Sequence, residues 1–134
     1  MMMEHRWTAL VTIVALLVYF GFSFQVARAR GTSKIEAPAM TGHPTLERAV
    51  RVHVNTLEWM PLFLTSLWLF AIYWNEFVAA GLGVVWIVGR IIYSAGYMAD
   101  PARRSTGFLI QGLTVVVLLF GALGRIVYSL ATGG

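Results

Sequence analysis

The sequence contains no cysteine, and only 12% of its 134 residues are charged. Without cysteine, the chain has no thiol nucleophile, no disulfide and no sulfur ligand for a metal. Soluble domains carry about 25% charged residues, whereas hydrophobic residues make up 58% of this chain and its mean hydropathy is +0.73. This composition excludes a soluble domain and a disordered chain, and it predicts an integral membrane protein.

Acidic residues are scarce as well, with 6 Asp and Glu against 10 Lys and Arg. A basic excess suggests nucleic-acid binding when the cations form a stripe that reaches phosphates. Here Arg90 and Arg125 instead interrupt apolar runs, so we expect no nucleic-acid partner. The three histidines are scattered through the sequence, which predicts no metal site.

Four long apolar stretches account for most of the chain. A helix that spans a membrane needs about 20 mostly apolar residues, and such stretches cover residues 7–27, 45–74, 77–98 and 107–130. A polar segment over 28–44, rich in Gly, Ser, Thr and Pro, separates the first two stretches. The first stretch is too long for the apolar region of a signal peptide, and its cations follow it rather than precede it. We predict an all-α fold, namely one integral membrane four-helix bundle over residues 1–134 with four transmembrane helices.

The positions of the cations predict how the spans are oriented. Near the ends of the first and third connections the sequence has Arg28, Arg30, Lys34, Arg103 and Arg104. The opposite side has only Arg6 and Arg125. Because Lys and Arg accumulate on the cytoplasmic side, we expect the loop 28–44 to be cytoplasmic and both termini to lie across the membrane. The last four residues carry no retrieval signal, which favours a bacterial inner membrane over the endoplasmic reticulum.

Polar side chains within the spans fall on two stripes. An ionised side chain at membrane depth costs about 2.5 to 3.5 kcal/mol on insertion scales, so it is expected to face the bundle interior or a wet cavity. Residues three or four positions apart share a helix face. The first stripe consists of Arg51, Asn55 and Glu58. The second consists of Arg90, Tyr93 and Tyr97, and it includes Arg104 if the third helix continues beyond Pro101.

Cations exceed anions in these stripes, because Arg51, Arg90 and Arg104 stand against Glu58 alone. This excess predicts a ligand with more negative than positive charge, and arginine is suited to bidentate recognition of carboxylates. Glutathione matches, since it has two carboxylates, one ammonium and an ionisable thiol, although another small zwitterionic anion would also match. The alternative without a ligand pairs Arg51 with Glu58 across two helical turns and lets Arg104 reach the membrane surface.

Two sequence motifs resemble those of a known family. Residues 47–61 read E-R-A-V-R-V-H-V-N-T-L-E-W-M-P, and residues 89–97 read G-R-I-I-Y-S-A-G-Y with Arg104 following. They resemble the second-helix and third-helix motifs of the membrane-associated proteins in eicosanoid and glutathione metabolism (MAPEG), most closely the microsomal glutathione transferases and the leukotriene C4 synthase-like group. The resemblance covers the four-span layout of the whole chain. It implies a homotrimer that binds glutathione between neighbouring subunits.

The same resemblance implies roles for individual residues. The glutathione-binding residues would be Arg30, Arg51, Asn55, Glu58, Arg90, Tyr93 and Tyr97. The catalytic residue would be Arg104, which would stabilise the thiolate. Secondary candidates are Arg28, His53, Trp59 and Ser105. His53 and Trp59 stand where the leukotriene synthase group has Gln and Tyr, and Ser105 resembles the serine of the arginine-serine pair in the prostaglandin E synthase branch.

The implied function is that of a membrane-bound glutathione transferase in detoxification, with glutathione peroxidase activity as a side reaction. The thiolate would attack a lipophilic electrophile or a lipid hydroperoxide that arrives through membrane lipid. One alternative is a non-catalytic member of the family that binds lipid or acts as a scaffold, and the presence of Arg104 and both tyrosines favours catalysis over it. Another is a small four-span multidrug transporter, which needs an acid in a membrane span to couple protons. The first span has none.

Overall fold

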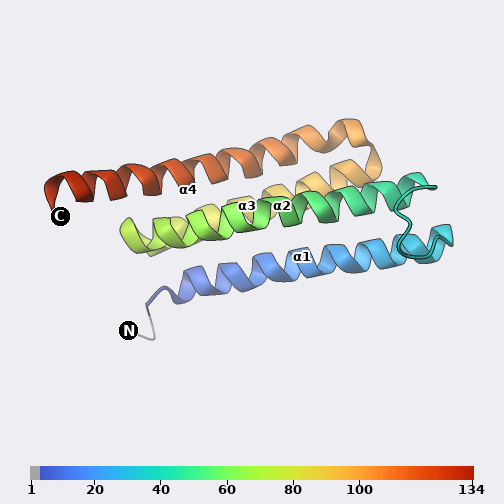
Figure 1. Ribbon diagram of the computed structural model, residues 1–134, viewed down its shortest axis with the longest axis horizontal. Coiled ribbons are helices and arrows are strands. Elements are labelled where there is room, and N and C mark those ends of the chain that lie inside the picture. The colour runs from blue at the N-terminus through green and yellow to red at the C-terminus, as the bar shows by residue number, and fades with distance from the viewer. Residues whose placement is uncertain (1–3) are drawn as a thin grey trace.

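The computed structural model describes residues 4–134 as four long helices (Figure 1). The elements are α1 (Arg6–Ser33), α2 (Pro44–Tyr73), α3 (Glu76–Ala99), the 3-10 turn η1 (Pro101–Arg104) and α4 (Ser105–Thr132). The helices run side by side, and the N- and C-terminal regions lie at the same end of the bundle (Figure 1). All four are long and apolar enough to cross a membrane. The prediction of an all-α protein with four membrane-spanning helices is confirmed.

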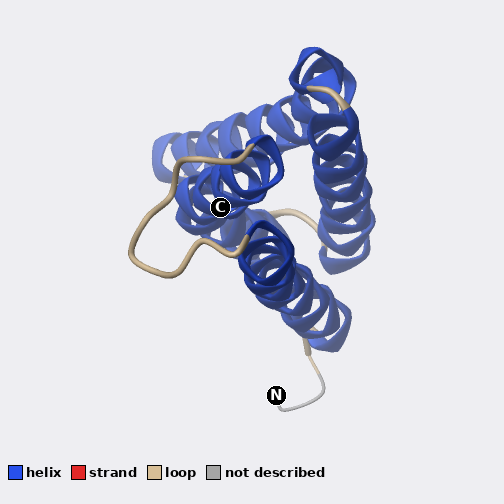
Figure 2. Cartoon of the chain, turned by 90° about the vertical axis from the view of Figure 1, so that its right-hand side faces the viewer, coloured by secondary structure: helices blue, strands red, loops and turns tan. Residues whose placement is uncertain are grey.

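The first connection is shorter than the predicted segment 28–44, because α1 continues to Ser33. The hydroxyl groups of Thr32 and Ser33 donate hydrogen bonds to the carbonyl oxygen of Ala29, at 3.2 and 2.7 Å. These hydroxyl bonds add to the main-chain hydrogen bonds of the last turns of α1. The helix ends at Lys34, which has a left-handed conformation with φ 59°. The remaining loop, residues 34–43, joins α1 to α2 at one end of the bundle and extends to one side of it (Figure 2).

Side-chain caps set the beginnings of α2 and α3. The His43 ring nitrogen Nδ1 accepts a hydrogen bond from the Thr45 N–H at 3.1 Å, and Pro44 occupies the first helical position, where its missing N–H costs nothing. Asn75 Oδ1 accepts from the N–H groups of Phe77 and Val78, at 2.8 and 3.0 Å. These partners replace the intrahelical bonds that the first N–H groups of any helix lack.

The third helix does not continue past Pro101. Proline disfavours a helical conformation in the residue before it, and Asp100 is extended, with φ −163° and ψ 120°. The Asp100 carboxylate then accepts from the Ala102 N–H at 3.1 Å and begins η1. Arg104 therefore belongs to a separate turn and does not extend the α3 stripe of Arg90, Tyr93 and Tyr97.

The core lies where α2, α3 and α4 meet. The rings of Phe63 and Trp86 stack at a centroid distance of 3.9 Å and an interplanar angle of 3°. The Trp86 indole donates to Gln111 Oε1 at 3.1 Å, so its one polar atom has a partner. The outward faces of α1 and α4 expose large apolar side chains, such as Leu17 and Leu109. An apolar outer surface is what a membrane-embedded bundle requires.

Glycines allow α3 and α4 to approach closely near η1. A Cβ atom on Gly107 would lie 2.1 Å from the Tyr93 nitrogen, and one on Gly89 would lie 2.9 Å from the Gln111 nitrogen. Both contacts are with backbone, which cannot move aside as a flexible side chain can. Small residues at these positions let the two backbones pack together, and this packing brings η1 against the end of α3.

Candidate functional site

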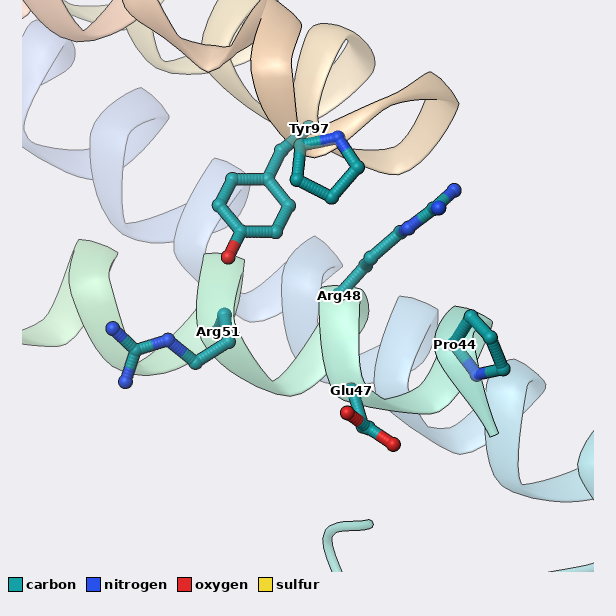
Figure 3. A pocket seen from close by; sticks show the side chains of 6 residues that line it. Pro44, Glu47, Arg48, Arg51 and Tyr97 are labelled. Atoms are coloured by element: carbon teal, nitrogen blue, oxygen red, sulfur yellow. The ribbon is translucent and has the colours of Figure 1, made fainter. Parts of the chain in front are cut away.

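A cavity of about 370 Å³ lies at the end of the bundle that carries η1 and the loop 34–43. Its lining residues are Pro44, Glu47, Arg48, Arg51, Tyr97 and Pro101. Figure 3 shows the Tyr97 ring directed from α3 toward the turn of α2 that carries Arg51. The cavity thus lies between the first turns of α2 and the junction of α3 with η1.

The first predicted stripe begins at this cavity. Arg51 lines it, and Asn55 and Glu58 follow on the same flank of α2, since residues at these spacings share a helix face. Arg51 and Glu58 are exposed, and Asn55 is half-buried. The structure therefore aligns an arginine, an amide and a carboxylate along one side of α2.

Arg90 lies beneath this stripe and is fully buried, with 0% of its surface exposed. Its Nη1 atom donates to Asn55 Oδ1 at 2.8 Å and to Thr56 Oγ1 at 3.2 Å. The guanidinium carbon lies 5.6 Å from the Trp86 ring centre and 4.8 Å from the Tyr93 ring centre. Cation–π contacts of this kind contribute about 2 kcal/mol when they are desolvated.

Two donors of the same guanidinium, Nε and Nη2, have no hydrogen-bond partner within residues 4–134. An unpaired buried donor costs about 1 to 3 kcal/mol, and more when it is charged. The side-chain acceptors of Arg90 are the neutral groups of Asn55 and Thr56, so no carboxylate bonded to it neutralises its charge.

Aromatic side chains lie beside Arg90 and reach the cavity at Tyr97. Tyr93 is 3% exposed, and its ring centre lies 5.7 Å from that of the half-buried Tyr97. Phe108 of α4 lies 6.0 Å from Tyr93 and 5.6 Å from Trp59. Trp59, Tyr93 and Tyr97 are thereby brought together from two helices.

Arg104 is close to the cavity through its own turn. Its Nη1 atom donates to the carbonyl oxygen of Pro101 at 2.7 Å, and Pro101 lines the cavity. Arg104 itself is exposed, as is Ser105 at the start of α4. The structure brings the guanidinium of Arg104 to the same end of the bundle as Arg51, although they lie on different elements.

Arg28, Arg30 and His53 do not line this cavity. Arg30 donates to the carbonyl oxygen of Ala39 at 2.6 Å and holds the loop 34–43. Arg28 borders another cavity, of about 280 Å³, beside α1.

His53 faces α1, where its ring stacks on that of Tyr19 at 4.9 Å and 3°. Because successive helical residues turn by about 100°, His53 and Arg51 point about 160° apart. A single chain therefore presents His53 and the first stripe on different sides of α2.

Three residues at the site were not predicted from the sequence. Arg48 lines the cavity and donates to the carbonyl oxygens of Met98 and Ala99, at 3.0 and 3.3 Å, which ties α2 to the end of α3. Glu47 accepts from the Gly42 N–H at 3.1 Å. Thr56 accepts from Arg90. Arg48 could have been predicted, because it lies three residues before Arg51 and so shares its helix face. Nothing in the sequence distinguishes Thr56.

Comparison with known proteins gives consistent matches along the chain. The model of the MAPEG family matches residues 8–131. The chain is 43% identical to an uncharacterized protein of Synechocystis, over 95% of this chain and 93% of that protein. It is 38% identical to human microsomal glutathione S-transferase 2, over 87% and 80%. It is 34% identical to rat leukotriene C4 synthase, over 95% and 85%.

Proposed function

We propose that this chain, which belongs to the MAPEG family, is a membrane-bound glutathione transferase. Its relatives include a glutathione S-transferase and a leukotriene C4 synthase, so the chain is a member of a glutathione-related transferase family. The observation that carries the proposal is the excess of guanidinium groups over carboxylates at one end of the bundle. Arg48 and Arg51 line the cavity there with Glu47 as the one carboxylate that residues 4–134 contribute to it, and exposed Arg104 lies at the same end.

Glutathione supplies the charges that this end lacks. In the proposed complex its carboxylates bind guanidinium groups, Arg51 first, because a planar fork of donors suits a carboxylate. Glu58 binds the ammonium, and Asn55 and Tyr97 hydrogen bond to polar groups of the tripeptide. Each of these side chains lies along the α2 flank or lines the cavity, and Arg51 and Glu58 are exposed there.

Arg104 is the proposed catalytic residue, with Ser105 beside it. A free thiol has a pKa of about 8.5, and a neighbouring guanidinium lowers it. At a separation of about 4 Å and an effective dielectric of about 20, such a charge supplies a few kcal/mol. Because one pKa unit corresponds to about 1.36 kcal/mol, thiolate becomes the main species at neutral pH.

The thiolate then attacks a lipophilic electrophile that enters from the membrane. With an aryl chloride, a carbon–sulfur bond forms, the carbon–chlorine bond breaks and chloride leaves, while the thiol proton has already passed to solvent. With a lipid hydroperoxide, the thiolate breaks the O–O bond and leaves a lipid alcohol and a sulfenic acid. A second glutathione reduces the sulfenic acid, giving the disulfide and water.

The proposed assembly is a homotrimer, with the η1 end facing the cytoplasm of a bacterial cell. His53 and Arg51 point to nearly opposite sides of α2, and Arg30 does not line the cavity of Arg51. If both sides of α2 contact glutathione, a second copy of the chain must contribute one of them. The relative from Synechocystis supports a bacterial membrane. Cross-linking of the purified protein in detergent tests the assembly, and a result of monomer alone would contradict a shared site.

Conjugation of glutathione with 1-chloro-2,4-dinitrobenzene by the purified protein tests the activity. We expect turnover that saturates with glutathione. Binding of glutathione without turnover of this compound or of a lipid hydroperoxide would instead identify a non-catalytic, lipid-binding or scaffolding member of the family.

A further inference from the structure

Arg90 lies deeper in the bundle than the cavity. It precedes the end of α3 at Ala99 by nine residues, or about 14 Å at 1.5 Å per residue. It is the one buried charged side chain among residues 4–134, and Tyr93 packs against its guanidinium. A ligand at the surface of α2 is therefore separated from Arg90 by other side chains, and Asn55 is the one that bonds to it from the polar stripe.

The hydrogen bond between Arg90 and Asn55 determines how the Asn55 carboxamide is oriented. A guanidinium has donors only, so the atom of Asn55 that faces it is the oxygen, Oδ1. The Nδ2 atom, on the other side of the carboxamide, donates no hydrogen bond within residues 4–134 and keeps two free hydrogens. Asn55 is half-buried between Arg51 and Glu58 on the outer flank of α2, which leaves these donors available on that flank.

Thr56 holds the guanidinium in register with Asn55. Its hydroxyl donates to the Val52 carbonyl oxygen at 2.7 Å, so its lone pairs are left to accept from Arg90. The same Nη1 atom thus bonds to two neighbouring residues of α2. Trp86 and Tyr93, on the same helix as Arg90, pack against the guanidinium, with ring centres 5.6 and 4.8 Å from its carbon.

We propose that Arg90 is a positioning residue, which holds Asn55 by its oxygen so that Nδ2 donates to an anionic or carbonyl oxygen of the substrate. This inference rests on the proposed function for the identity of that substrate. It replaces direct contact between Arg90 and glutathione with contact through Asn55. Without Arg90, Oδ1 and Nδ2 of Asn55 have similar size and no partner that tells them apart. The carboxamide then no longer keeps Nδ2 directed at the ligand.

A double-mutant cycle measures whether the two residues act as one. The proteins are the wild type, Asn55→Ala, Arg90→Met and the double variant, and the measurement is the Kd for glutathione by calorimetry in detergent. We expect each single variant to bind about tenfold more weakly, and the double variant to be no weaker than either single one. A loss of about a hundredfold in the double variant would show independent contacts. An unchanged Kd for Arg90→Met would also overturn the proposal.

The orientation of Asn55 can be measured without a ligand, because the chain contains only two asparagines, Asn55 and Asn75. Labelling asparagine with ¹⁵N gives two side-chain amide signals, and Asn55→Asp identifies one of them by its loss. We expect Arg90→Met to shift or broaden the Asn55 signal, and Arg90→Lys to do so less. The Asn75 signal is the internal control, since its side chain caps α3 at the other end of the bundle. An unaltered Asn55 signal in Arg90→Met would overturn the proposal.

Arg125→Met is the matched control, because Arg125 also lies over two aromatic rings, Trp74 at 5.5 Å and Tyr128 at 5.3 Å. It should change neither the Kd nor the Asn55 signal. If Arg90→Met fails to fold, Arg90→Gln replaces it in both measurements, since it also removes the guanidinium, and an unchanged Kd or Asn55 signal in that variant would equally overturn the proposal. Should the wild type release no binding heat with glutathione while its Asn55 signal responds to Arg90→Met, the proposed function fails and the positioning of Asn55 stands.

Discussion

At the end of the bundle that carries the termini, polar groups find partners within the chain. Glu76 accepts a hydrogen bond from the Trp7 N–H at 2.8 Å, and the Trp74 indole donates to the Gly121 carbonyl oxygen at 2.7 Å. Arg125 lies over the Trp74 ring at 5.5 Å. These contacts join α1 to α3 and α2 to α4, so the polar groups of this end contribute to holding the helices together.

At the η1 end, cationic groups remain available. Arg51 is exposed beside the cavity and Arg104 is exposed on η1, while Arg90 lies deeper, fully buried, with two donors that have no partner in the described chain. Buried or confined charge of this kind is unfavourable unless something neutralises it. We therefore expect substitutions of the cationic residues at the η1 end to change ligand binding and turnover, and substitution of Arg125 at the other end to change packing alone.

The largest effect is expected from Arg104→Ala. Turnover of 1-chloro-2,4-dinitrobenzene should fall about 25-fold near pH 7, because a rise of about two units in the pKa of the bound thiol, to about 8.5, lowers the thiolate fraction from about three quarters to about 3%. Because losing the cation raises that pKa toward the free value of about 8.5, the deficit should shrink as the pH rises from 7 to about 8.5 and nearly vanish above it. Stopped-flow absorbance of the thiolate checks this, with Arg104→Lys as the variant that keeps the charge. An unchanged thiolate signal in Arg104→Ala would remove Arg104 from the catalytic role.

Next in size is a pair of glycine substitutions that compares packing at the two ends. Gly107→Ala places a Cβ 2.1 Å from the Tyr93 nitrogen, whereas Gly124→Ala meets nothing within 4 Å. We expect Gly107→Ala to lower the free energy of unfolding by about 1 to 3 kcal/mol, as overpacking usually does. Gly124→Ala should be neutral or slightly stabilising, since alanine favours helix. Unfolding in mixed detergent micelles measures both, and equal stabilities would contradict the close approach of α3 and α4.

Arg51→Ala should weaken glutathione binding about tenfold, because it removes a charge-assisted hydrogen bond of roughly 1.5 to 3 kcal/mol in part compensated by solvent. Turnover at saturating glutathione should change much less, since Arg51 is proposed to bind the tripeptide rather than the thiol. Calorimetry and steady-state rates separate the two quantities. A lower turnover at saturating glutathione with an unchanged Kd would contradict a role for Arg51 in binding the tripeptide.

The smallest functional effect is expected from Arg125→Met. Glutathione binding and turnover should stay within about twofold, while the free energy of unfolding falls by up to about 2 kcal/mol with the loss of the cation–π contacts. Binding measurements and micelle unfolding on the same preparation check this. A tenfold weaker Kd would break the distinction between the two ends.

Composition was enough to predict the fold class, because four apolar runs of this length have few stable arrangements outside a helical bundle. The ends of the helices were harder to predict from composition. The helix α1 continues to Ser33, inside the expected loop, and the local hydrogen bonds of Thr32 and Ser33 in its last turns cannot be predicted from hydropathy. Conversely, the extended conformation of Asp100 follows directly from Pro101.

For the site, spacing predicted which residues share a helix face but not how deep they lie. Arg51, Asn55 and Glu58 do lie on one flank of α2, whereas Arg90 is buried and bonds to Asn55 and Thr56. The burial of a residue such as Arg90 depends on how closely α3 and α4 pack. That distance is set by tertiary contacts at Gly89 and Gly107. The roles of these residues toward glutathione remain predictions for the experiments above.

Calorimetric titration with two compounds tests whether the guanidinium groups of the η1 end bind the carboxylates of glutathione. Glutathione carries both carboxylates, and its diethyl ester carries none while retaining the thiol and the ammonium. If the guanidinium groups of the η1 end bind an anionic tripeptide, glutathione should bind saturably with release of heat and the diester should bind at least tenfold more weakly, or about 1.4 kcal/mol less. Equal affinity for the two compounds, or no binding of either, would show that these arginines do not form a site for an anionic tripeptide.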